Sequence, residues 1–73
     1  MNLKKPKNTF VLEDRIIKIV EFLSKGYTSK DIAKKGNIGV QSVEKIILQT
    51  RNHYKSENTT HLVATFLRKN IIK

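Results

Sequence analysis

The sequence predicts an all-α domain of four short helices. Apolar residues recur every three or four positions in four separate segments, which is the spacing of one face of a helix. Residues typical of helix ends, such as glycine, threonine and asparagine, separate these segments, and no segment shows the alternation typical of a strand. The helices are expected over about residues 11–25, 28–35, 39–54 and 58–69 of the 73-residue chain.

The first helix, over residues 11–25, is expected to serve as scaffold. Ile16, Ile19, Val20 and Leu23 form its apolar face, and acidic residues near its start suit the positive end of the helix dipole. Gly26 follows as a C-cap, because glycine readily adopts the backbone conformation that ends a helix.

The second helix, over residues 28–35, has a clear start signal. The Thr28 hydroxyl can accept a hydrogen bond from a free backbone N–H, and Asp31 can reach back to the N–H of Thr28, which together make a capping box. Gly36 and Gly39 then bracket a turn, where we expect glycine conformations closed to other residues. A short helix, a glycine-marked turn and a longer helix together predict a helix-turn-helix, whose second helix enters the DNA major groove.

The third helix, over residues 39–54, separates into two faces at about 100° per residue. Ile47, Thr50 and Tyr54 fall within about 40° of Val43, and the four side chains form a core-facing stripe. The outward side is polar and contains amides, a lysine and one leucine, which are side chains that can contact base edges. It is formed by Gln41, Lys45 and Asn52, flanked by Leu48, Gln49 and Lys55. The alternative is an ordinary solvated helix face.

The fourth helix, over residues 58–69, is expected to begin at a cap formed by Asn58 or Thr59. Its apolar face consists of Leu62, Val63, Phe66 and Leu67. These four side chains either pack inside the domain or form a two-fold contact with a second copy, as symmetric DNA half-sites require.

Charge and composition limit the classes of function. The chain has 15 Lys and Arg against six Asp and Glu, a net charge of +9, and such a surplus is typical of domains that bind nucleic acid. Residues 1–9, with Lys4, Lys5 and Lys7, are expected to form a flexible basic arm ahead of a single domain over residues 10–73. With no cysteine, no signal-peptide pattern and no apolar run near the roughly 20 residues of a membrane span, we expect a soluble cytoplasmic protein that does not bind membranes.

Several short motifs in one register point to a family. Residues 26–33 read GYTSKDIA, where that family has G-x-S-N-K-E-I-A. Further agreements are Ile38, Ser42-Val43, Asn58, Leu62 and Val63. Over residues 12–63 the chain therefore resembles the LuxR-type (GerE-like) helix-turn-helix DNA-binding domain, which ends many bacterial response regulators and quorum-sensing regulators.

The resemblance implies a four-helix module for transcription regulation, often dimeric through its last helix, whose sensor or receiver domain would lie outside this chain. The family's groove-reading positions fall on Glu44, Lys45 and Leu48. Two departures stand out. Gly39 replaces the serine that caps the family's recognition helix, and Glu44 replaces a lysine, where its carboxylate could accept a hydrogen bond from cytosine N4.

We therefore predict a DNA-binding transcription regulator. Base edges would be read by Gln41, Glu44, Lys45, Leu48 and Gln49. DNA phosphates would be neutralised by Lys30, Lys34, Lys35, Arg51 and Lys55. The chain has no phosphate-binding loop, no zinc pattern around His53 and His61 and no catalytic constellation, so we expect no enzyme activity, no metal and no cofactor.

Two other functions use the same features differently. In a protein-interaction module, the last helix with Ile71 and Ile72 would dock onto a larger regulator or a polymerase. RNA binding would share the positive charge, but single-stranded bases stack on surface aromatic side chains. Of the five aromatic residues, only Phe10 is expected to be free for such stacking.

Overall fold

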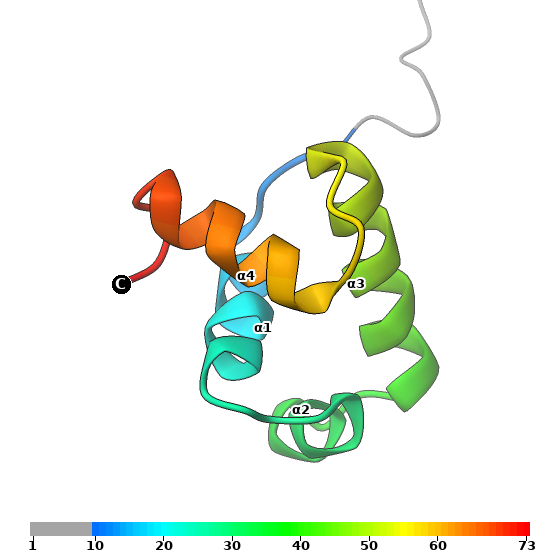
Figure 1. Cartoon of the computed structure of the whole chain (residues 1–73). Helices are drawn as coiled ribbons and strands as arrows, with labels where there is room; N and C mark the ends of the chain where they lie inside the picture. Colours follow the sequence, from blue (N-terminus) through cyan, green and yellow to red (C-terminus); the bar gives the residue numbers. More distant parts are fainter. Residues whose placement is uncertain (1–9) are drawn as a thin grey trace, which may run out of the picture.

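The computed structural model describes residues 10–73 and contains four helices (Figure 1). They are α1 (Asp14–Ser24), α2 (Ser29–Gly36), α3 (Val40–Tyr54) and α4 (Thr59–Arg68). No strand occurs within residues 10–73, and the predicted all-α class is confirmed. The expected basic arm over residues 1–9 lies outside the described residues.

Helix α1 begins three residues later than expected, at Asp14 rather than at residue 11. Glu13 is its N-cap residue with an extended backbone. Val11 is 60% exposed and Leu12 is 37% exposed, so an additional turn would bury little apolar surface. Tertiary packing supplies most of a helix's stability, and an unpacked turn upstream of Glu13 therefore does not form.

Side-chain caps fix the starts of α2 and α4 as predicted. The Thr28 hydroxyl accepts from the Asp31 N–H at 3.1 Å, and the Asp31 carboxylate accepts from the Thr28 N–H at 3.0 Å. At α4, the Asn58 side-chain oxygen accepts from the His61 N–H at 2.8 Å. Gly39, the N-cap residue of α3, makes no side-chain cap.

The turn between α2 and α3 differs from the prediction. The residue in the left-handed region is Asn37, with φ 54°, whereas neither Gly36 nor Gly39 has a positive φ. Asparagine tolerates this conformation better than other side chains because it is short and polar. The predicted glycine conformation does occur after α1, where Gly26 has φ 87°.

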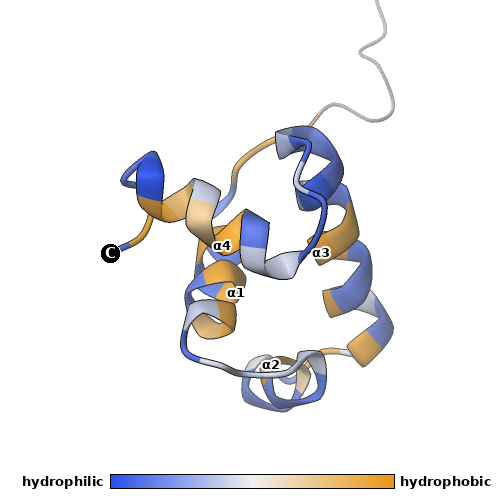
Figure 2. Cartoon of the chain, in the orientation of Figure 1, coloured by the Kyte–Doolittle hydropathy of each residue, from blue (hydrophilic) through white to orange (hydrophobic). Residues whose placement is uncertain are grey.

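Two clusters of buried side chains form the core, and α1 contributes to both. Ile19 of α1 packs with the buried apolar residues of α2 and α3, which are Ile32, Ala33, Val43 and Ile47. Val20, the next residue in α1, packs with Leu62, Phe66 and Ile72. Figure 2 shows the apolar parts of α1 and α4 turned toward the interior. Helix α1 thus joins the helix-turn-helix pair to α4.

The chain folds back on itself after α4. Asn70 has φ 61°, and the Ile71 N–H donates to the Phe66 carbonyl at 2.9 Å. This turn places Ile72 in the core, where it is only 3% exposed. Ile71 is half-buried beside the same cluster. The proposed docking of Ile71 and Ile72 onto a partner is therefore wrong for Ile72, because the domain itself covers this side chain.

Candidate nucleic-acid interface

The outward face of α3 is uncovered. Its residues, which we call the outer face of α3, are all exposed: Gln41, Glu44, Lys45, Leu48, Gln49 and Asn52. The opposite stripe is buried, with Val43 at 0% and Thr50 at 1% exposure. The predicted orientation of this helix is confirmed, and no other described helix covers its polar side (Figure 1).

Packing and one side-chain hydrogen bond hold α3 in this orientation. Val43 and Ile47 belong to the core cluster shared with α1 and α2. The Thr50 hydroxyl donates to the Ile46 carbonyl at 2.7 Å, which satisfies a buried polar group within the helix. The helix that carries the outer face is thus anchored along most of its length.

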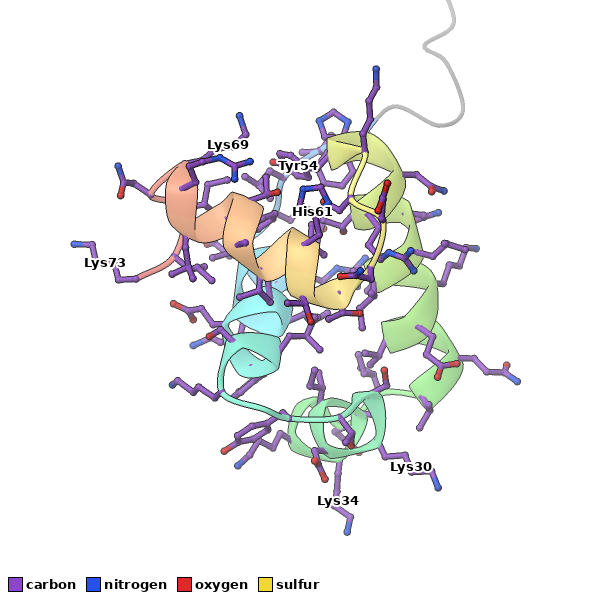
Figure 3. All side chains as sticks on the ribbon, viewed as in Figure 1. Lys30, Lys34, Tyr54, His61, Lys69 and Lys73 are labelled. Atoms are coloured by element: carbon purple, nitrogen blue, oxygen red, sulfur yellow. The ribbon has the colours of Figure 1, made fainter. Side chains whose placement is uncertain are left out.

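Exposed lysines lie on α2, next to α3. Lys30 and Lys34 extend from α2 at one edge of the domain, whereas Lys69 and Lys73 lie beyond α4 at the other side (Figure 3). Lys35 is also exposed, and its Nζ lies 5.3 Å from the centroid of the Tyr27 ring. The only ion pair within residues 10–73 joins Arg15 to Glu13 at 3.2 Å. None of these lysines therefore forms an ion pair within that part of the chain.

Asp31, the one acidic residue of α2, is occupied by its own helix. The Thr28 N–H, followed by the Thr28 hydroxyl, holds the pKa of the Asp31 carboxyl below its ordinary value of 3.8, and Lys34 and Lys35 lower this pKa further. The carboxylate is therefore charged at neutral pH and caps the helix. Even so, three lysines against one aspartate leave α2 positively charged.

Arg51 does not present a free guanidinium as expected. It is only half-exposed, its Nη2 donates to the Glu57 carbonyl, and its Nε is buried with no partner among the described residues. This side chain holds the connection between α3 and α4 through one of its N–H donors, and its assignment as a phosphate contact stays a prediction. Lys55, the residue after α3, is exposed with φ 54° and remains available for such a contact.

The segment before α1 lies along one side of α3. The Phe10 ring stacks on His53 with centroids 4.1 Å apart and meets the Tyr54 ring edge-on at 5.8 Å. The expectation that Phe10 is free is therefore wrong. Between this segment and α3 lies an open groove of about 710 Å³, whose lining includes Arg15, Gln49 and Asn52.

The apolar face of α4 is largely used inside the domain. Leu62 and Phe66 are 0% exposed, so they cannot contact a second copy, and that part of the expected dimer surface is wrong. Val63 is half-buried and Leu67 is 44% exposed. Only these two of the four expected residues remain at the surface.

The two histidines have structural neighbours. His53 stacks on Phe10, and the His61 Nδ1 accepts from the Glu57 N–H at 3.2 Å, beside the cap of α4. Within residues 10–73, no group of three or more His, Asp or Glu is arranged to hold a metal ion. None of the four described helices is long and apolar enough to cross a membrane.

The chain was compared with models of protein families, with curated proteins and with solved structures, and none of the three comparisons finds a match.

Proposed function

We propose that this domain binds double-stranded DNA, with α3 in the major groove. The observation that carries the proposal is the uncovered outer face of α3 beside the unpaired lysines of α2. A major groove about 12 Å wide admits an α-helix. In a helix-turn-helix, the second helix contacts base edges while the first crosses the DNA backbone.

The exposed residues divide into two groups by chemistry. Lys30, Lys34, Lys35 and Lys55 would neutralise phosphates, which gives affinity and sets the register but carries no sequence information. On the outer face, Lys45 suits the O6 and N7 acceptors of guanine, and Gln41 and Gln49 suit the N6 and N7 groups of adenine. This division, together with the short motifs that resemble LuxR-type domains, favours a role in transcription regulation. The domain would be the cytoplasmic output domain of a bacterial regulator whose sensor or receiver domain is a separate part or partner.

Binding to random duplex DNA at increasing salt tests the electrostatic part of the proposal. Each neutralised phosphate adds about 0.9 to the slope of log K against log salt. Lys34→Ala should therefore weaken binding to all duplexes alike and make the slope about one unit shallower. Lys73→Ala removes the same charge on the other side of the domain (Figure 3) and should leave the slope unchanged.

Sequence reading is tested separately with Lys45→Ala. This variant should lose discrimination among duplexes, at a cost of roughly 1–3 kcal/mol on the preferred site. Lys45 is exposed, so the fold should remain intact. A Lys45→Ala protein that kept its full site preference would contradict the placement of the outer face on base edges.

A two-fold repeat in duplexes selected from a random pool would indicate dimeric docking, with Val63 and Leu67 as the available contacts.

The protein-interaction alternative makes the opposite prediction. In that case, wild-type protein would show no salt-sensitive binding to duplex DNA. Burial of Leu62, Phe66 and Ile72 removes much of the apolar surface that this alternative requires.

A further inference from the structure

Glu44 places an unpaired carboxylate on the outer face of α3. Its side chain is exposed and makes no hydrogen bond or ion pair with any of the described residues 10–73. The positions three and four residues away, where a helical partner would stand, are Val40, Gln41, Ile47 and Leu48. None of these is a cation, and Lys45 next to it points about 100° away around the helix.

Two of the other acidic residues within residues 10–73 have a visible structural use. Glu13 pairs with Arg15, and Asp31 completes the capping box of α2. Asp14, Glu21 and Glu57 make no side-chain bond among the described residues, and neither does Glu44. Of these four residues, only Glu44 lies on the outer face of α3, a surface rich in lysine and amide side chains. A carboxylate that faces a DNA groove is repelled by the phosphates, so it lowers affinity unless the bases offer it a hydrogen-bond donor.

In the major groove, the hydrogen-bond donor with the fewest neighbouring acceptors is that of cytosine. Guanine presents two acceptors, and thymine presents an acceptor and a methyl group. In an A·T pair the adenine N6 donor lies between two acceptors, adenine N7 and thymine O4, which repel a carboxylate. In a C·G pair the cytosine N4 donor has an acceptor, guanine O6, on one side only. An ionised carboxylate accepts hydrogen bonds but cannot donate them. The chemistry of Glu44 therefore selects cytosine.

Leu48 adds an apolar contact one helical turn further along. Its side chain is 52% exposed and lies about 40° from Glu44 around the helix axis. Four residues of helix span about 6 Å, or one to two base pairs at a rise of about 3.4 Å. The base feature that suits a leucine at this distance is the methyl group of thymine.

We infer that Glu44 and Leu48 determine sequence specificity: Glu44 requires a cytosine, and Leu48 favours a thymine one or two base pairs away. The inference rests on the proposed binding of DNA by α3. Glu44 acts largely by discriminating against other sequences, since its charge weakens binding wherever cytosine is absent.

Selection of duplexes from a random pool tests this inference, with wild-type protein, Glu44→Gln and Glu57→Gln compared. The wild-type motif should contain one required cytosine. Glu44→Gln should keep the rest of the motif but replace that cytosine by adenine, because glutamine pairs with adenine N6 and N7. Its affinity for the wild-type motif should fall roughly 5- to 150-fold, while its affinity for random duplex should rise.

Glu57→Gln is the matched control, because it removes the same charge from an exposed residue outside α3. It should retain the cytosine. Leu48→Ala should lose preference at the thymine position alone. Circular dichroism would verify that each variant is folded.

Two results would overturn the inference: a wild-type motif without a required cytosine, or a Glu44→Gln motif in which the cytosine persists. Either result is compatible with salt-sensitive binding to DNA and leaves the proposed function standing. The proposed function fails only if wild-type protein binds no duplex in a salt-dependent way.

Discussion

Ile72→Ala should destabilise the domain strongly although it lies next to the last residue of the chain. The Ile72 side chain is 3% exposed and packs with Val20, Leu62 and Phe66. The substitution removes three buried carbon atoms at about 0.8 kcal/mol each, which gives a loss of about 2–3 kcal/mol. A cavity adds little here, because a chain end can relax around the smaller side chain.

This loss is a large part of the total free energy of unfolding. A chain of 73 residues is expected to have about 4–11 kcal/mol in all. The midpoint of thermal unfolding, followed by circular dichroism at the helix band, should fall by about 8–24 °C. Ile71→Ala, at a half-buried position in the same turn, should cost about half as much. If Ile72→Ala unfolded within about 3 °C of wild type, the packing of the tail against α1 and α4 would be refuted, and Ile72 would again be available for a partner.

The remaining predictions concern helix ends. Thr28→Ala should remove the bond from the Asp31 N–H to the Thr28 hydroxyl and keep the bond from the backbone N–H of residue 28 to Asp31. It should destabilise the domain by about 1 kcal/mol in urea unfolding, whereas Ser29→Ala should have little effect. The pKa of Asp31 is lowered in the folded domain. The contribution of Asp31 to the free energy of unfolding is therefore fully present at pH values above its pKa in the unfolded chain, and it is lost as the pH falls through its pKa in the folded domain. Asp31→Asn should flatten this part of a titration of stability against pH, and an unchanged titration would contradict the capping box. Lys55→Gly should stabilise the domain by about 0.5–1 kcal/mol, because φ is 54° there and glycine tolerates that region. Lys69→Gly, at φ −87° after α4, should instead destabilise it, and equal effects at the two sites would contradict the assigned backbone conformations.

Local signals in the sequence predicted most of the fold. The capping box at Thr28, the cap at Asn58 and the buried stripe through Val43 each depend on residues within one or two helical turns. Such interactions can be inferred from spacing alone. The start of α1 could not be inferred in this way, because Val11 and Leu12 are apolar but remain exposed instead of packing on the core.

The differences from expectation at the candidate site arose from contacts between segments distant in sequence or from unusual backbone. Arg51 is at the edge of the polar side of α3, and only the position of the Glu57 carbonyl decides that its guanidinium turns inward. Phe10 stacks on His53, 43 positions further along the chain. Asn37 rather than glycine takes the left-handed conformation in the turn. In contrast, the exposure of Lys45 and Leu48 followed from helical periodicity, because the buried stripe fixes the orientation of the whole helix.

The packing of Phe10 also has a practical consequence for the design of fusion proteins. Phe10, the first described residue, stacks on His53 in the last turn of α3, so the upstream end of the described chain lies beside the surface proposed to meet DNA. The other terminus is held by Ile72 against α1 and α4, on the far side of the domain from α3 (Figure 1). Fluorophores, affinity handles and surface tethers are therefore best placed after Lys73, where they leave α3 open to a duplex.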